Sequence, residues 1–243
     1  MTTEPKFLPL GDTALTVEFA ETIDRATNAR VIGLDAGLRD AAFDGVIESV
    51  PTFRSLTIHF DPITLDHATL ETLITDLLAH PFDANTMERT WRIPVCYDGN
   101  FAPDLNDVAE QSGLDPLAVV ERHAQQPYFV YMIGFLPGLP YLGDLPKELD
   151  LPRRKNPRVR VPPGSVAIAA GLSTIYPYES PGGWHLIGRT PVSLFSHLQA
   201  PPSLLAPGDT VHFEPVDRAE FARLEGLEFD QLKSLCLEPE GTA

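Results

Sequence analysis

The first 95 residues alternate between the two periodicities that distinguish strands from helices. Alternating apolar residues predict four short strands, at 14–19, 45–50, 55–60 and 91–95. Two helices are predicted between them, one from Asp24 to about Leu38 and one along the apolar stripe of residues 70–78. This order of elements indicates a small split βαβ, ferredoxin-like α/β domain over residues 1–86, whose last strand could instead belong to the domain that follows.

Residues 87–243 show a different pattern, in which short alternating runs are separated by Pro-Gly turns. A helix from Pro116 to about Ala124 has Asp115 as its N-cap, and a last helix is predicted over 217–226. Fourteen of the 24 prolines lie between residues 127 and 208, which excludes a long helix there. The alternating runs predict strands at 128–135, 165–171, 184–190, 192–195 and 209–215. An α+β protein with a closed or partly closed C-terminal β-barrel is therefore expected.

Charge and composition restrict the class of protein. The net charge of −16 disfavours nucleic acid and anionic membranes as partners. No apolar run approaches the roughly 18 residues of a membrane span, and no basic segment followed by an apolar stretch opens the chain, so a soluble, cytoplasmic protein is expected. Two cysteines, Cys96 and Cys236, make neither a disulfide framework nor a cysteine zinc site, and Cys96 is expected to be a buried, inert thiol. The acidic residues show no metal-ligand spacing, so no metal is predicted.

One short segment of this acidic chain is basic. Between Lys147 and Arg160 there are six basic residues and two acidic ones. Guanidinium groups match the oxygens of a carboxylate or phosphoryl group, so this segment could bind a small anion, with Arg153 and Arg158 favoured because nearby prolines restrain their backbone. The alternative is a solvated loop that pairs with the acidic surface.

The segment 134–191 mixes glycine, proline, aromatic and arginine residues. Glycine lets a backbone approach a ligand, and proline fixes a loop before binding, so this is the expected site. The candidate substrate-binding residues are Arg153, Arg158, Tyr141, Ser180, Gly182, Gly183, Trp184 and His185. Possible supporting residues are His123, Tyr131, Ser165, Tyr176 and Arg189. For the histidines, tyrosines and Ser165, structural roles as core, packing or turn residues remain open.

Several catalytic motifs are absent from the sequence. It contains no GxSxG elbow, Ser-x-x-Lys, HExxH or GxxxxGK[ST] pattern. Catalytic residues are therefore unassigned, and the incomplete set indicates one component of a larger assembly.

The sequence resembles the family that comprises the B subunit of 5-oxoprolinase, allophanate hydrolase subunit 1 and KipI-type proteins. The motifs that carry the resemblance are LGDTALTVEF (10–19), VPTFRSLTIHFDP (50–62), IPVCYDGNFAPDL (93–105), YMIGFLPGLPYLGDLP (131–146), PRRKNPRVRVPPGSV (152–166) and IYPYESPGGWHLIGRTP (175–191). The resemblance implies a cyclophilin-like β-barrel over residues 87–243. The chain departs from the family's pattern at Leu136, Leu139, Leu172 and Thr174.

The resemblance also implies a function and partners. The leading interpretation is the B subunit of an ATP-dependent 5-oxoprolinase, which hydrolyses 5-oxo-L-proline to L-glutamate with a C subunit (allophanate hydrolase subunit 2-like) and an A subunit of the LamB/YcsF type. ATP would be used by the assembled complex, and the isolated chain is expected to be inactive. The alternatives are an allophanate hydrolase or urea carboxylase-type component, and a KipI-like histidine kinase inhibitor. In the leading interpretation Arg153 and Arg158 hold a carboxylate, and Tyr141, the 180–183 loop and His185 surround the carbonyl.

Overall fold

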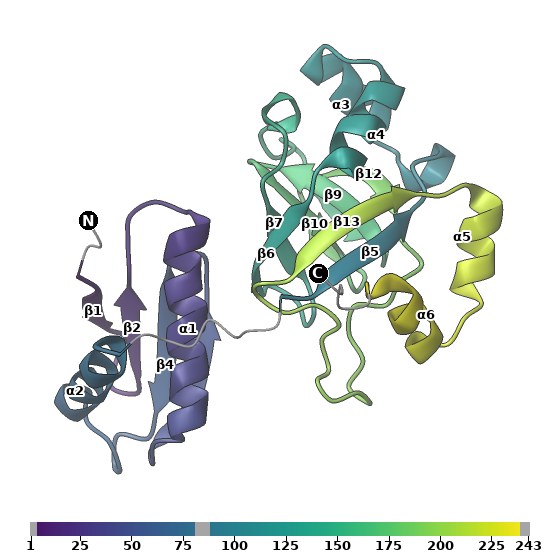
Figure 1. The fold of residues 1–243 in the computed structure, drawn as a ribbon. Helices are drawn as coiled ribbons and strands as arrows, with labels where there is room; N and C mark the ends of the chain where they lie inside the picture. Colours follow the sequence, from purple (N-terminus) through teal and green to yellow (C-terminus); the bar gives the residue numbers. More distant parts are fainter. Residues whose placement is uncertain (1–3, 81–87, 239–243) are drawn as a thin grey trace. The chain divides into compact units, whose positions relative to one another are not determined.

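The computed structural model describes residues 4–80 and 88–238 and divides the chain into two units, Met1–Met87 and Glu88–Ala243. The domain boundary predicted after residue 86 lies outside the described residues. Each unit has its own hydrophobic core. The two units are coloured along the sequence in Figure 1.

The N-terminal unit is a four-stranded antiparallel sheet with two helices. Its elements are β1 (Lys6–Pro9), β2 (Ala14–Glu18), α1 (Arg25–Ala41), β3 (Val46–Pro51), β4 (Ser55–Phe60) and α2 (His67–Leu78). Asp24 and Asp66 begin the two helices, because their carboxylates accept the backbone N–H of Thr27 and Thr69 at 2.8 Å. The core contains alternate residues of β2 and β4 and the apolar faces of both helices, among them Leu15, Val17, Leu34, Ile58 and Ile74.

The strand order of this sheet is β1-β2-β4-β3. Strand β4 lies antiparallel between β2 and β3, so β2, α1 and β3 form a split βαβ arrangement. The strand that a ferredoxin-like domain needs after its second helix does not join this sheet, because residues 90–95 pair with a strand of the other unit. The edge position beside β2 is occupied by β1, which the sequence did not predict. The ferredoxin-like prediction is therefore not confirmed.

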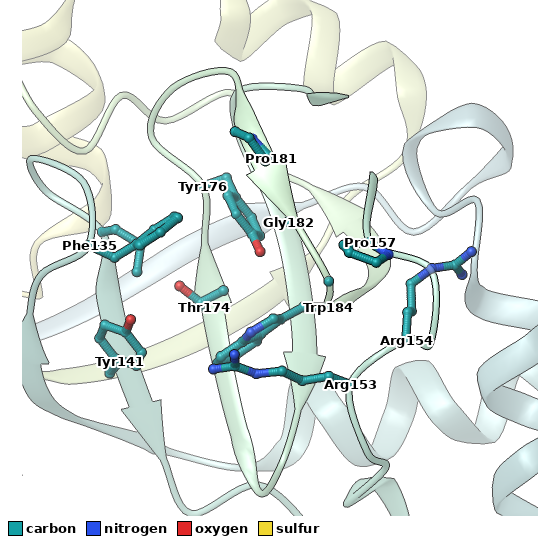
Figure 2. Close-up of a pocket in the computed structure, with 12 residues that line it drawn as sticks. Phe135, Tyr141, Arg153, Arg154, Pro157, Thr174, Tyr176, Pro181, Gly182 and Trp184 are labelled. Atoms are coloured by element: carbon teal, nitrogen blue, oxygen red, sulfur yellow. The ribbon is translucent and has the colours of Figure 1, made fainter. Parts of the chain in front are cut away.

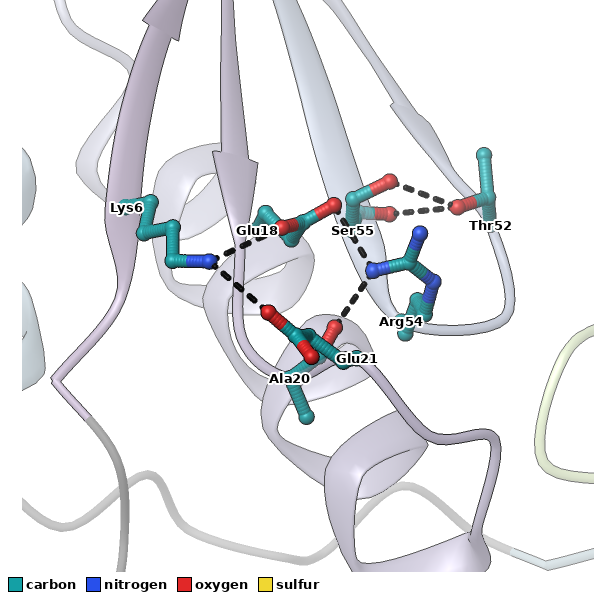
Figure 3. A network of polar contacts seen from close by, with 7 residues as sticks. All are labelled: Lys6, Glu18, Ala20, Glu21, Thr52, Arg54 and Ser55. Atoms are coloured by element: carbon teal, nitrogen blue, oxygen red, sulfur yellow. Dashed lines mark hydrogen bonds and ion pairs between the residues drawn. The ribbon is translucent and has the colours of Figure 1, made fainter.

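Polar contacts connect the edge strand β1 to the rest of this unit (Figure 3). Glu18 lies between two cations, with Lys6 Nζ at 3.8 Å and Arg54 Nη1 at 2.7 Å. Arg54 also donates to the carbonyl of Ala20 at 2.5 Å, and Lys6 reaches Glu21 at 3.4 Å. Because these side chains are partly solvated, the network contributes little to stability and mainly fixes the turn that leads into α1.

The C-terminal unit is built on a seven-stranded sheet with the order β12-β9-β10-β7-β6-β13-β5. Its strands are β5 (Thr90–Val95), β6 (Tyr128–Ile133), β7 (Pro140–Gly143), β9 (Ser165–Ala169), β10 (Leu172–Ile175), β12 (His185–Arg189) and β13 (Thr210–Pro215). Arg189, the last residue of outer strand β12, and Cys96, which follows outer strand β5, exchange backbone hydrogen bonds of 2.8 and 2.9 Å. The sheet therefore closes into a nearly complete barrel, which confirms the barrel prediction.

Short helices and loops surround this barrel (Figure 1). A separate two-stranded sheet, β11-β8, belongs to the same unit. These elements are β8 (Arg158–Val161), β11 (Ser180–Gly182), η1 (Gly99–Phe101), α3 (Leu105–Ser112), α4 (Pro116–Gln125), η2 (Lys147–Leu149), α5 (Arg218–Glu225) and α6 (Phe229–Cys236). Helix α4 begins at Pro116 as predicted, and α6 was not predicted. The strand predicted at 192–195 is wrong, because this segment forms only a single bridge, between Phe195 and Ser203. In the described ranges 4–80 and 88–238, none of the helices has the length and apolar content needed to cross a bilayer.

His123 lies in the core of this barrel unit and is fully buried. Its Nδ1 lies 2.8 Å from the hydroxyl of Tyr97, its Nε2 lies 3.0 Å from Oγ of Ser173, and its ring stacks on Phe213. All these groups are satisfied when Tyr97 donates to Nδ1 and Nε2–H donates to Ser173. Burial lowers the pKa of His123 to about 3, so the ring is neutral.

The buried histidine predicts a pH dependence of stability. Because its folded-state pKa lies below the ordinary value, the unfolded chain takes up the proton first as the pH falls, and stability is lost below about pH 6.5 toward pH 3. The free energy of unfolding of wild type relative to His123→Gln should fall by about 1.4 kcal/mol per pH unit in this range. Both tryptophans, Trp91 and Trp184, belong to this unit, so urea unfolding followed by fluorescence measures it directly. A difference that stays constant from pH 7 to pH 4 would contradict this.

Candidate functional site

A pocket of about 240 Å³ opens on the barrel unit (Figure 2). Phe135, Leu139 and Tyr141 contribute one side of its wall, from the β6–β7 loop and β7. The remaining wall comes from Thr174 and Tyr176, from the arginine loop (residues 152–157) and from the glycine loop (residues 181–184). The residues that line this small cavity thus come from segments as far apart in the sequence as Phe135 and Trp184, which are separated by 49 positions.

Aromatic rings and one guanidinium determine the character of this pocket. Trp184 is nearly buried, with 7% of its surface exposed, and the ring of Tyr141 meets it edge-on at 6.3 Å between centroids. The guanidinium carbon of Arg153 lies 5.9 Å from the centre of the Trp184 ring. No described acidic side chain forms an ion pair with Arg153, so its charge remains available to an anion from solution.

The position of Arg153 is fixed by its two neighbours in the chain. The carbonyl of Pro152 accepts a 2.9 Å hydrogen bond from Nε2 of His185. On the other side, the backbone N–H of Arg154 donates to the carbonyl of Gly183 at 2.8 Å. Gly183 lies between β11 and β12, and His185 is the first residue of β12. Because both flanking residues are bonded to this segment, the backbone of Arg153 is fixed beside Trp184 before any ligand arrives.

A buried carboxylate, Asp104, attaches the arginine loop and the start of β8 to strand β12, which follows the glycine loop. Its Oδ1 accepts Nη1 of Arg154 and Nη2 of Arg158, both at 2.6 Å. Its Oδ2 accepts the backbone N–H of Leu186 at 2.7 Å, and Leu186 in turn accepts the N–H of Asp104 at 3.0 Å. With 2% of its surface exposed, Asp104 makes charge-assisted bonds that are short and strong. Sequence reasoning missed this residue, since an aspartate directly before a helix indicates only an N-cap.

Gly182 allows the glycine loop to approach Tyr176. A Cβ atom at Gly182 would lie 2.5 Å from the Tyr176 hydroxyl and 2.9 Å from Cγ2 of Val161, which is closer than atoms can pack. Burial raises the pKa of Tyr176 to about 12, so its hydroxyl keeps its proton and can donate to an oxygen of a ligand. A glycine is therefore required here for contact and not for flexibility.

The structure brings part of the predicted set of site residues together. Arg153, Tyr141, Tyr176, Gly182, Gly183 and Trp184 all line the pocket. The pocket wall also contains residues that were not in the predicted set, namely Phe135, Leu139, Arg154, Pro157, Thr174 and Pro181. Thr174, singled out as a departure from the family's pattern, donates its hydroxyl to the carbonyl of Pro140 at 2.6 Å.

Three further candidates for substrate binding lie outside the pocket wall. The guanidinium of Arg158 is bound to Asp104, and the hydroxyl of Ser180 is directed to the carbonyl of Pro181 at 3.3 Å. His185 is buried and bonded to Pro152. Each side chain is thus engaged in holding the loops, and its predicted contact with substrate stays a prediction.

The other supporting candidates also have structural partners away from the pocket wall. Ser165 donates to the carbonyl of Pro162 at 2.7 Å, which agrees with a turn serine. Tyr131 is buried with its ring edge-on to Phe129, and Arg189 donates to the carbonyl of Pro163 at 3.0 Å. His123 belongs to the core as described above. Among residues 4–80 and 88–238, no group of three or more His, Cys, Asp or Glu side chains could hold a metal ion.

The fold and the pocket together define a barrel domain that presents one available guanidinium among aromatic rings. Residues 5–205 match the family model described as carboxyltransferase domain, subdomain C and D. The chain belongs to this family.

Relatives and solved structures agree with this assignment. The chain is 37% identical to the 5-oxoprolinase B subunit of Bacillus subtilis over 235 residues, covering 91% of this chain and 97% of the relative. It is 39% identical to the protein of the same name from Escherichia coli O157:H7, covering 85% of this chain and 94% of the relative.

Among solved structures, TTHA0988 matches with a TM-score of 0.76 and 35% identity over 85% of this chain, and the chain spans 40% of that longer protein. The urea amidolyase of K. lactis shares the fold, with a TM-score of 0.73 over 90% of this chain and 15% of its own, but only 22% identity.

Because Asp104 binds Arg154, Arg158 and the backbone of Leu186, we predict a large loss of stability when the charge of Asp104 is removed. Asp104→Asn leaves two partly buried guanidinium groups without an anion, and the free energy of unfolding of the barrel unit should fall by about 3 kcal/mol. Tryptophan fluorescence in a urea titration measures the change.

Asp98→Asn is the matched control, because Asp98 makes a 2.8 Å ion pair with Arg218 but is 69% exposed. Its loss should be below about 1 kcal/mol. Equal losses in the two variants would show that the buried carboxylate has no special role.

Proposed function

We propose that this protein is the B subunit of a 5-oxoprolinase complex, which hydrolyses 5-oxo-L-proline to L-glutamate with partner subunits. The observation that carries the proposal is the guanidinium of Arg153, which has no described acidic partner and lies against Trp184 in a pocket of about 240 Å³. A cavity of this size suits a small carboxylate. The names of the bacterial relatives, which align over nearly their whole length, support the same substrate.

The pocket provides groups for both ends of such a substrate. Arg153 would hold the carboxylate, and the flat ring of the lactam would lie among Tyr141, Tyr176 and Trp184. The protonated hydroxyl of Tyr176 can donate to the lactam carbonyl and stabilise the negative charge that develops on it during ring opening. These residues bind, orient and polarise the substrate.

Partner subunits would supply the remaining chemistry. The described wall of the pocket contains no carboxylate, histidine, cysteine or lysine side chain that could act as a general base or nucleophile. We therefore assign ATP use and the catalytic base to a C subunit of the allophanate hydrolase subunit 2-like kind and to an A subunit of the LamB/YcsF type. We expect the isolated chain to be inactive.

The alternative function is that of a urea carboxylase or allophanate hydrolase-type component. A urea amidolyase from Lachancea kluyveri is 28% identical over 211 residues, which cover 74% of this chain and 11% of that protein. The lower identity makes this the weaker proposal. Urea lacks a carboxylate for Arg153, whereas allophanate carries one, so the two proposals are separated by comparing the substrates in one assay.

The test is to co-express the chain with its two partners, the C subunit and the LamB/YcsF-type protein, and to measure glutamate released from 5-oxoproline and ATP. We expect release only from the complete assembly, with urea and allophanate inactive in the same assay. Release no greater than that from each protein expressed alone would reject the proposal, and turnover of allophanate alone would replace it with the alternative.

Within that assembly, Arg153→Met should lower kcat/KM for 5-oxoproline by about 10- to 100-fold, since one hydrogen-bonded charge pair is lost. Arg160→Met is the matched control, because Arg160 lies in the same segment but is 78% exposed and pairs with Glu179 at 3.5 Å. Its kcat/KM should remain at the wild-type value. Equal effects of the two substitutions would remove Arg153 from the binding site.

A further inference from the structure

Phe135 occupies an unusual backbone conformation at the pocket. Its φ angle is +69°, in the left-handed region that is strained for any residue with a Cβ atom and rare for a bulky one. Its side chain lines the pocket and is nevertheless 69% exposed. An exposed apolar ring on a strained backbone lowers the stability of the folded protein. Stability therefore does not explain why a phenylalanine occupies this position.

The surrounding loop holds Phe135 in this conformation. The N–H of Gly134 donates to the carbonyl of Leu139 at 3.0 Å, and the N–H of Leu139 donates to that of Leu136 at 3.1 Å. Gly138 is packed so closely that a Cβ there would lie 2.7 Å from Cβ of Phe195. Leu139 is buried in the pocket wall, and Leu136 packs against the same apolar cluster as Leu139. Backbone strain that neighbours enforce in this way is concentrated at functional sites.

The place of the ring in the pocket indicates what it contacts. In Figure 2, Phe135 and Tyr141 lie on one side of the cavity, and Gly182, Trp184 and Arg153 lie on the other. A flat ligand whose carboxylate reaches Arg153 would therefore present one apolar face toward Phe135. Binding would bury the exposed ring, which stabilises the complex through apolar contact.

We propose that Phe135 is a specificity-determining residue that covers the ring face of a small cyclic amide carrying a carboxylate. This inference rests on the proposed function. It adds to that function a residue that discriminates between the cyclic substrate and the open-chain product. Opening the lactam adds a carboxylate and an ammonium group, and both are costly to desolvate against an aromatic ring. Phe135 thus favours the closed substrate over the open product.

Three variants separate the effect of the aromatic ring on substrate binding from the effect of the backbone strain on stability. Phe135→Gly removes both ring and strain, Phe135→Ser removes the ring but keeps a Cβ atom, and Phe135→Tyr keeps both. The midpoint of thermal unfolding of the isolated chain should rise by about 2–4 °C for Phe135→Gly and stay near wild type for Phe135→Tyr. In the assembled complex, KM for 5-oxoproline should rise about tenfold for the glycine and serine variants and stay unchanged for tyrosine.

Ala170→Gly is the matched control for strain. Ala170 has a φ of +50° in the turn between β9 and β10 and does not line the pocket. This substitution should also raise the unfolding midpoint, but it should leave KM unchanged.

Three results would overturn the inference. A lower unfolding midpoint for Phe135→Gly would show that the backbone is not strained. An unchanged KM for Phe135→Ser in an active complex would show that the ring does not contact substrate, and reduced co-purification with the partners would then place it in an interface with them. A wild-type complex without 5-oxoprolinase activity would reject the proposed function and this inference with it. Because this third result is measured on the wild-type complex, it is distinguished from the two results that are measured on variants of Phe135.

Discussion

One buried carboxylate determines how the arginine loop meets strand β12 beside the pocket. Asp104 binds Arg154 and Arg158 through one oxygen and the backbone of Leu186 through the other, so a single side chain connects the arginine loop to strand β12. Removing one partner from an ion pair this poorly solvated is strongly destabilising, because it leaves a buried charge without compensation. The rest of the site depends on this contact, because the arginine loop carries Arg153 and Trp184 directly precedes β12.

The division of work among neighbouring arginines follows from that constraint. Arg154 and Arg158 share one negative charge inside the protein, whereas Arg153 between Pro152 and Arg154 remains without a described acidic partner. Two arginines thus fix the backbone, and we propose that the third, which lies over the ring of Trp184, binds the ligand. A preformed site of this kind binds without ordering its loops, which is the role that the prolines of this segment also serve.

Much of the fold could be predicted from the sequence because local signals determined it. The apolar spacing after Asp24, the cap at Asp115 and the dense prolines of the C-terminal half led to the correct helices and to a barrel. The edge strand β1 and the Asp104 contact could not be predicted, since both depend on partners far away in the chain. The burial of His123 could not be predicted for the same reason, because Ser173 and Phe213, which enclose its ring, lie far away in the chain. Phe135 gave no signal, as a positive φ in a bulky residue is invisible in sequence.

The central claim is that the Asp104 contact presents Arg153, without an acidic partner, to a carboxylate at the aromatic pocket. A crystal structure of the complete chain with 5-oxo-L-proline tests it most directly. We predict electron density for the carboxylate within hydrogen-bonding distance of the Arg153 guanidinium, beside Trp184, with both Arg154 and Arg158 still bound to Asp104. Ligand density elsewhere on the protein, or Arg153 turned away to an acidic side chain of the protein, would contradict it.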